Sequence, residues 1–104
     1  MQNKQAEYIY LNGYIDVPEE KLEIVKQALV THIALTHAEP GCIAFNVTAD
    51  TKVKGRFLVA EIFETQTAFD NHQLRTKASK WFEITKDIPR EYSINVGSAP
   101  NIKN

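Results

Sequence analysis

The sequence has little of the chemistry that most cofactor sites require. It contains one cysteine, Cys42, so no disulfide can form within the chain. Its three histidines show no HxxxH spacing and its cysteine is in no CxxC pair, so common metal-site motifs are missing. Its four glycines form neither a phosphate-binding loop nor a dinucleotide-binding fingerprint. We therefore expect a protein that works without a metal, nucleotide or flavin cofactor.

The sequence also lacks a strong net charge and a long hydrophobic run. The formal charge of -1 provides no basic surface field, which argues against nucleic acid or an anionic membrane as a partner. No apolar run approaches the roughly 18 residues of a membrane-spanning helix, and residues 1–8 lack the apolar core of a signal peptide. With the single cysteine, these absences predict a cytoplasmic protein.

The length and composition are those of one small globular domain. The chain has 104 residues, of which 43% are hydrophobic and 24% are charged. A chain of this length can fold alone, although it buries only about two-thirds of the surface that its unfolded form exposes. We expect a single domain over residues 1–104, with its folded core at about residues 8–97.

The strongest local signal lies in residues 56–72. Residues 57–63 are apolar at every position except Glu61, which predicts a strand covered on both faces. A carboxylate in such a strand is costly unless it is paired, hydrogen-bonded or protonated. Residues 65–72 then show the spacing of a short helix with His72 on its inner face. A buried carboxylate and an inward histidine therefore lie on consecutive elements.

The other elements follow from periodicity and from start and stop residues. The pattern predicts strands over 8–17, 42–50 and 90–97, with a turn over 50–55. It predicts a helix that opens at 17–20 and ends at the turn 37–41, and a helical segment over 78–88. The short helix of residues 65–72 would be capped by Thr65 or Thr67 and followed by a break over 73–77.

This order of strand, helix, strand, strand, helix, strand predicts an α+β fold of the ferredoxin-like split βαβ type. Its antiparallel strands take the order 4-1-3-2, which places Asn12 and Glu61 on adjacent central strands. The two helices cover one face of the sheet. Because residues 57–63 are apolar on both faces, a second copy of the chain is the economical cover for the other face. We therefore expect a homodimer.

The remaining chemistry is that of an acid–base site. His72 titrates near neutrality and can move a proton, and Asn12 can donate a hydrogen bond to a developing oxyanion. Glu61 can orient His72 or interact with its charge. The plainer alternatives stay open: His72 can be a core histidine satisfied by backbone, and Glu61 can form an ion pair with Arg56, Arg75 or Arg90. His37 and Glu39, in the turn after the first helix, are expected to be solvated.

Three runs together resemble the antibiotic biosynthesis monooxygenase domain, a family that includes small quinol monooxygenases. They are Glu-Pro-Gly-Cys-Ile-Ala-Phe at 39–45, residues 57–64 with their Glu-Ile-Phe-Glu ending, and Ala-Phe-Asp-Asn-His at 68–72. The resemblance covers roughly residues 8–96. It implies a dimeric α+β barrel that oxidises a quinol or polyphenol with dioxygen and uses no metal, flavin or haem. An electron-rich phenolate can itself donate the electron that dioxygen needs.

The resemblance also implies roles for individual residues. His72 would be the base, Asn12 the donor to the substrate anion, and Tyr14, Phe63 and Trp81 an aromatic lining that binds substrate together with Glu61. Related barrels that degrade haem resemble the chain at Asn12, but they usually carry a tryptophan where His72 stands and a histidine near Phe82, which counts against haem here.

Two other functions fit the same fold. Some relatives isomerise small phosphorylated molecules, and Arg56, Arg75 and Arg90 could bind a phosphate. A dimeric module that binds a ligand without turnover is the other alternative.

Overall fold

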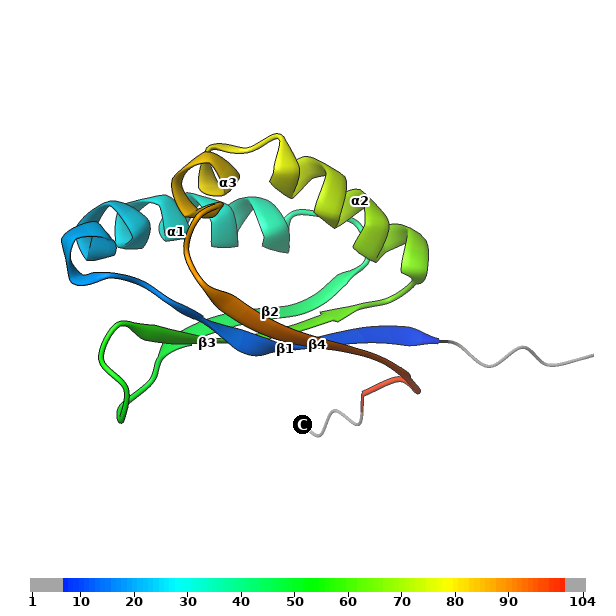
Figure 1. The fold of residues 1–104 in the computed structure, drawn as a ribbon. Coiled ribbons are helices and arrows are strands. Elements are labelled where there is room, and N and C mark those ends of the chain that lie inside the picture. Colours follow the sequence, from blue (N-terminus) through cyan, green and yellow to red (C-terminus); the bar gives the residue numbers. More distant parts are fainter. Residues whose placement is uncertain (1–6, 101–104) are drawn as a thin grey trace, which may run out of the picture.

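The computed structural model describes residues 7–100 and shows one sheet covered on one face by helices (Figure 1). The elements are β1 (Tyr8–Asp16), a 3-10 turn η1 (Glu19–Lys21), α1 (Leu22–His37), β2 (Cys42–Ala49), β3 (Arg56–Phe63), α2 (Gln66–Lys77), α3 (Lys80–Thr85) and β4 (Arg90–Gly97). The strands form an antiparallel sheet in the order β2-β3-β1-β4. The predicted α+β ferredoxin-like fold and its strand order are confirmed.

The helix ends follow the side chains that can cap them. The Thr65 hydroxyl accepts a hydrogen bond of 3.0 Å from the Ala68 amide and so caps α2. The break predicted over 73–77 is wrong, because α2 continues to Lys77. None of the residues 73–77 is a glycine or proline. The chain breaks instead before Ser79, whose hydroxyl accepts from the Phe82 amide and starts α3.

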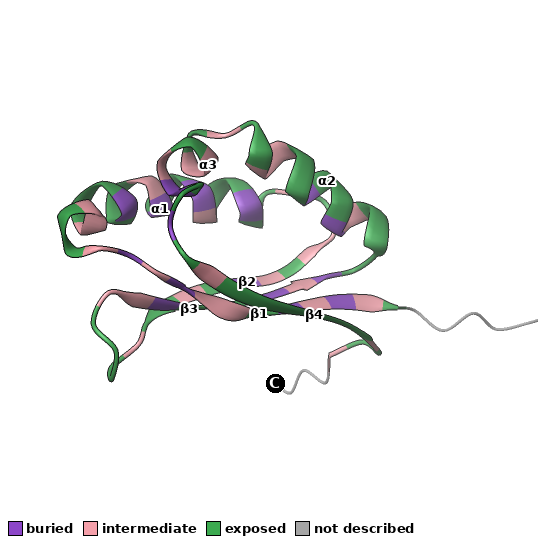
Figure 2. Cartoon of the chain, in the orientation of Figure 1, coloured by how far each residue is buried: buried purple, intermediate pink, exposed green. Residues whose placement is uncertain are grey.

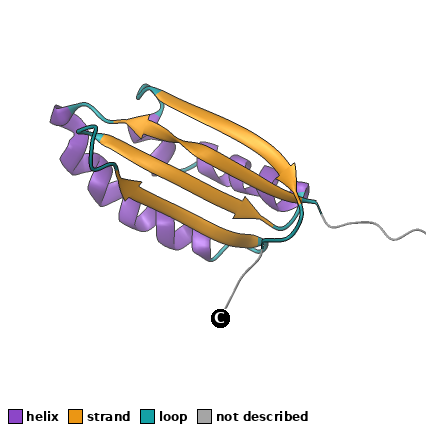
Figure 3. Ribbon diagram, turned by 90° about the horizontal axis from the view of Figure 1, so that it is seen from below, coloured by secondary structure: helices purple, strands orange, loops and turns teal. Residues whose placement is uncertain are grey.

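The strand register decides which side chains face the helices. Leu11 of β1 and Phe45 of β2 both pair with Glu61 of β3, so these three side chains share the helix-covered face. Asn12 pairs with Ala60, one position along, and therefore belongs to the opposite face. Figure 3 views the sheet from that opposite face, where no described helix lies over the strands. We call it the open face.

The hydrophobic core fills the space between the sheet and the helices (Figure 2). Phe63, Ile9, Ile15 and Val25 are almost completely buried there. The helices contact β1, β2 and β3, whereas β4 at the sheet edge is exposed along most of its length. Among the described residues, no helix is long and apolar enough to cross a membrane.

Candidate functional site

A cavity of about 230 Å³ lies between the sheet and the α2–α3 segment. We call it the inner chamber. Both the sheet and the helix layer contribute polar and aromatic side chains to its lining. Its lining includes Phe45 from β2, Glu61 from β3, His72 from α2, Trp81 from α3, and Arg90 and Tyr92 from β4.

His72 is 2% exposed and is held from one side by a carboxylate. Its Nδ1 lies 2.9 Å from Oε1 of Glu39. Because a carboxylate only accepts hydrogen bonds, this contact places the N–H on Nδ1 and leaves the lone pair on Nε2. Nε2 lies 3.4 Å from the Thr76 hydroxyl and 3.8 Å from Oε1 of Glu61. Such an imidazole can accept a proton from a hydroxyl group bound in the chamber.

Glu39 occupies the turn after α1, where the sequence predicts a solvated side chain. That expectation is wrong, because only 14% of the Glu39 side chain is exposed. Its second oxygen, Oε2, pairs with Nε of Arg75, whose Nη2 donates a 2.9 Å hydrogen bond to Thr36. The turn lies against α2 because Gly41 adopts a φ of +85° and leaves room for Ala68. No local pattern predicts this contact between residues 33 positions apart.

His37, the other residue of that turn, does stay on the surface. Its ring is exposed, and its Nε2 lies 2.9 Å from the carbonyl oxygen of Phe45. It therefore contacts the edge strand β2 rather than the inner chamber, whose lining does not include it.

Glu61 is 6% exposed and forms none of the ion pairs that the sequence allowed. Within the described chain, Arg56 pairs with Asp16, Arg75 pairs with Glu39, and Arg90 donates to the carbonyls of Thr85 and Ile88. The Glu61 Oε1 atom has no hydrogen-bond partner among the described residues. Burial, together with the negative charge of Glu39, raises the pKa of Glu61 to about 7. This carboxyl group therefore changes its charge close to neutral pH.

The two buried imidazoles are uncharged at neutral pH. Burial lowers the pKa of His72; the Glu39 charge and hydrogen bond oppose this shift, and the Arg75 charge adds to it. Burial, with the charges of Arg75 and His72, lowers the pKa of His32 to about 3. Sequence analysis did not identify His32 as a site residue. Its spacing from the buried Leu29 and Thr36 was the signal that could have identified it.

Aromatic rings surround the imidazoles on two sides. His32 stacks on Trp81 with ring centroids 4.8 Å apart and an angle of 3° between the planes. Phe63 packs behind His72, with centroids 4.9 Å apart, and is fully buried. Trp81 is among the residues that line the inner chamber, whereas Phe63 is not and supports the His72 ring from the core.

The structure does not bring Asn12 and Tyr14 to His72. Both side chains belong to the open face, because the period of two along β1 gives Leu11 and Ile15 to the core. Asn12 is exposed, and Tyr14 lies beneath the Arg56 guanidinium, whose carbon is 3.7 Å from the ring centroid. Within one copy of the chain, Asn12 and Tyr14 therefore lie on the opposite side of the sheet from His72, although β1 and β3 are adjacent as predicted.

The site residues form no metal cluster. Within residues 7–100, no group of three or more histidine, cysteine, aspartate or glutamate side chains could hold a metal ion. The chemistry that the chamber itself offers is proton transfer by His72 and Glu61 beside an apolar, aromatic lining.

Replacing Glu61 with glutamine should stabilise the protein only at higher pH. The pKa of Glu61 in the folded protein, about 7, lies above the ordinary 4.5. The folded state therefore binds this proton more tightly than the unfolded state does. The resulting stabilisation is fully present below pH 4.5 and is lost as the pH rises through 7. Glutamine cannot ionise, so the variant should gain about 3 kcal/mol in free energy of unfolding over the parent at pH 8. Below pH 4.5 the two should differ little.

Urea unfolding of the parent and of Glu61→Gln between pH 4 and pH 8 measures this difference. Glu64→Gln, at an exposed position next to the same strand, is the matched control and should show no such trend. A difference between Glu61→Gln and the parent that stays constant across the range would contradict the raised pKa.

Comparison with known proteins adds a family. The family model described as antibiotic biosynthesis monooxygenase matches residues 8–83. A comparison with curated proteins found no match.

Several solved structures share the fold. The chain is similar to a candidate antibiotic biosynthesis monooxygenase from Nitrosomonas europaea, at 22% identity with a TM-score of 0.72, over 93% of this chain and 95% of that one. A candidate monooxygenase of the same kind from Deinococcus radiodurans is 21% identical, with a TM-score of 0.73 over 92% and 96% of the two chains. MupZ from Pseudomonas fluorescens is 18% identical, with a TM-score of 0.73 over 90% of this chain and 71% of that one. Identities this low support a shared fold and nothing more.

Because the family model spans well over half of the chain, the protein belongs to the antibiotic biosynthesis monooxygenase family.

Proposed function

We propose that the protein acts in the cytoplasm as a cofactor-independent monooxygenase that oxidises a quinol or polyphenol with dioxygen. Family membership supports the reaction class. The observation that carries the proposal is the arrangement of His72, whose Nδ1 is held by Glu39 while its Nε2 lies near Thr76 and Glu61, two residues that line the inner chamber. A base in this position can turn a phenol into the phenolate that reacts with dioxygen.

The first step is removal of the substrate's hydroxyl proton by Nε2 of His72. The imidazolium that forms is stabilised by the Glu39 carboxylate 2.9 Å from Nδ1. Oε1 of Glu61 lies 3.8 Å from Nε2 of His72. In its protonated form, the Glu61 carboxyl group can donate a hydrogen bond to the phenolate oxygen. The raised pKa of Glu61 supports this role, because an ionised carboxylate would repel the anion.

The second step transfers electrons from the phenolate to dioxygen. A quinol and dioxygen give a hydroxyquinone and water: one oxygen atom enters the ring, and the other leaves with two hydrogens of the substrate. The apolar side chains of Leu11, Val59 and Phe45 in the lining exclude water, which protects the reduced oxygen species from loss to solvent. Trp81, in the same lining, provides an aromatic surface for the ring.

Replacing His72 should abolish the oxidation. We expect dioxygen uptake with members of a hydroquinone and polyphenol panel when no metal or flavin is added. His72→Ala should reduce the rate by about 10²- to 10⁴-fold, the usual contribution of a general base. An oxygen electrode measures the rates, and His37→Gln, at an exposed histidine outside the chamber, serves as the control. If no panel member consumes dioxygen faster than the uncatalysed reaction, the proposal fails.

An isomerase is the second candidate, and one observation favours it. Lys77 and Arg90 both line the inner chamber, where their charges could hold a phosphate near His72. Turnover under anaerobic conditions would establish this candidate, whereas the monooxygenase has none without dioxygen. A binding module without catalysis would show ligand-induced stabilisation and no turnover under either condition.

We also propose that two copies pair through the open face. Tyr8, Tyr10 and Tyr14 of β1 lie there beside Leu58 and Ile62 of β3, and Leu58 is 42% exposed in the single chain. Two sheets packed face to face would bury these side chains. A two-fold axis would bring the same patch from both copies together. The small aromatic substrate would bind on the other side of each sheet.

A charge in this patch should separate the copies. The parent should sediment at twice the mass of the chain. Leu58→Lys should sediment as a monomer, because the variant would bury a lysine from each copy in the contact between the two sheets. Leu74→Lys, at an exposed leucine of α2 on the helix side, is the control and should remain a dimer. Analytical ultracentrifugation at micromolar concentration makes the comparison. A monomeric parent would remove the open face as a contact between copies.

A further inference from the structure

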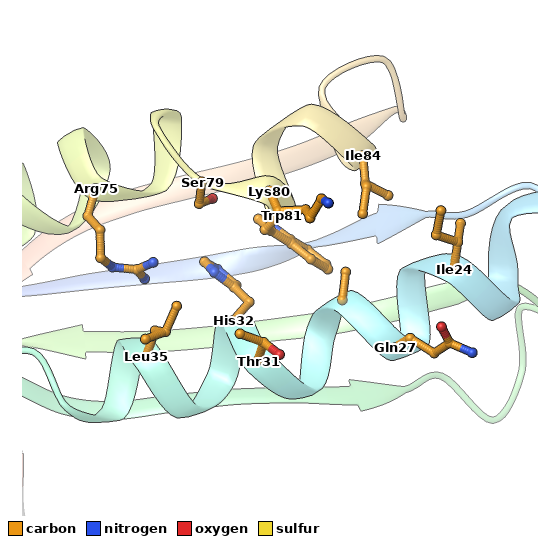
Figure 4. A pocket seen from close by; sticks show the side chains of 11 residues that line it. Ile24, Gln27, Thr31, His32, Leu35, Arg75, Ser79, Lys80, Trp81 and Ile84 are labelled. Atoms are coloured by element: carbon orange, nitrogen blue, oxygen red, sulfur yellow. The ribbon is translucent and has the colours of Figure 1, made fainter.

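A second cavity, of about 350 Å³, opens between α1 and the start of α3 (Figure 4). We call it the interhelical groove. No strand residue lines it, and it lies on the side of the helix layer away from the sheet. Among the residues that the structure describes, only His32 and Trp81 line both the groove and the inner chamber. Their stacked rings therefore form the partition between the two cavities.

One end of the groove carries two buried nitrogen atoms without hydrogen-bond partners. Nη1 of Arg75 and Nδ1 of His32 are both buried, and neither has a hydrogen-bond partner among the described residues. His32 itself is only 5% exposed. Figure 4 shows the Arg75 guanidinium extending toward the His32 ring. Buried polar atoms in proteins are nearly always satisfied, so two orphaned nitrogens at one end of an open cavity indicate a missing polar partner. Nη1 of Arg75 can only donate, and Nδ1 of the neutral His32 ring donates in one of its two tautomers.

The rest of the groove combines positive charge with apolar walls. Lys80 lines it along with Arg75, and no aspartate or glutamate does. Leu35, Ile84 and the face of Trp81 provide the apolar surface. Arg75 already balances the charge of Glu39, so within residues 7–100 about one uncompensated positive charge remains in the lining, that of Lys80. A single negative charge therefore fits better than the double charge of a phosphate monoester.

We propose that the interhelical groove is a second binding site, which takes a small carboxylate with an apolar body. The two carboxylate oxygens accept hydrogen bonds from Nη1 of Arg75 and, in the tautomer that carries its proton on Nδ1, from His32. The apolar body lies along Leu35, Trp81 and Ile84. Lys80, at the solvent side, attracts the anion.

The groove is joined to the inner chamber through one side chain. Arg75 holds Glu39, and Glu39 holds His72. The charged and titratable groups nearest His72 are Glu39 from the turn after α1, Glu61 from β3, His32 from α1 and Arg75 from α2 itself. Lys77 from α2 and Arg90 and Tyr92 from β4 line the same chamber. The positive charge of Arg75 lowers the pKa of His72. An anion bound to Arg75 offsets that charge, so it should raise the pKa of His72.

Binding of octanoate to the full chain tests the site without any turnover, so its outcome is independent of the proposed monooxygenase. Trp81 is the single tryptophan, and its fluorescence reports binding in either cavity; calorimetry provides the affinity. Octanoate should bind saturably, and octanamide, which has the same tail and no charge, should bind at least about tenfold more weakly. Equal binding of the two, or no binding of octanoate, would overturn the proposal.

Variants then identify the cavity. Leu35→Glu places a negative charge at a half-exposed position of the groove and should weaken octanoate binding at least about tenfold, and Lys80→Gln should weaken it by a smaller factor. Lys77→Gln removes a lysine that lines the inner chamber instead, and it should leave the affinity nearly unchanged. Binding that is lost in Lys77→Gln and kept in Leu35→Glu would place octanoate in the chamber and overturn the assignment.

A titration of His72 tests the link between the cavities. Its NMR titration midpoint should move to higher pH when octanoate saturates the groove, and octanoate should bind more tightly as pH falls through that midpoint. The octanamide control should not move the midpoint. A midpoint unchanged or lowered by saturating octanoate would show that Arg75 does not transmit the ligand's charge to His72.

Discussion

The hydrogen bond between Glu39 and His72 connects two parts of the chain that lie 33 positions apart. It joins the turn after α1 to the middle of α2, and Arg75 holds the carboxylate from its second oxygen. The bond does two things at once. It secures the imidazole ring, and it assigns the proton to Nδ1, so that a lone pair on Nε2 faces the inner chamber. The proposed catalysis depends on that lone pair, and the groove is linked to the chamber through the same bond.

Burial gives these groups their chemistry at some expense of stability. Glu61 lies on the core face of β3 and makes no ion pair with any described arginine. An apolar side chain at this position would therefore give a more stable fold than the carboxyl group does. Its raised pKa keeps it largely uncharged just below neutrality, which limits the cost of burial and leaves a hydrogen-bond donor beside Nε2. The same dry environment keeps His32 and His72 neutral, and their aromatic neighbours Trp81 and Phe63 fix the rings.

Local signals predicted much of the fold but little of the electrostatics. The apolar run of β3, the Thr65 cap and the Pro40-Gly41 turn each encode their element directly, and their order indicated the ferredoxin-like sheet. The adjacency of β1 and β3 was predicted, but adjacency alone does not bring Asn12 to Glu61, because Leu11 pairs with Glu61 and Asn12 belongs to the other face. Glu39 could not be found in this way, because its environment is set by a contact with α2 far along the chain. The lack of an arginine partner for Glu61 is likewise visible only after folding.

The tautomer and charge of His72 in solution test the central claim most directly. In ¹⁵N-detected NMR of the labelled protein at pH 7, with the His72 signals identified by their loss in His72→Gln, the account predicts a neutral ring with the proton on Nδ1 and a bare Nε2. A doubly protonated ring at pH 7, or a neutral ring with its proton on Nε2, would contradict the account, because neither form presents a base to the chamber.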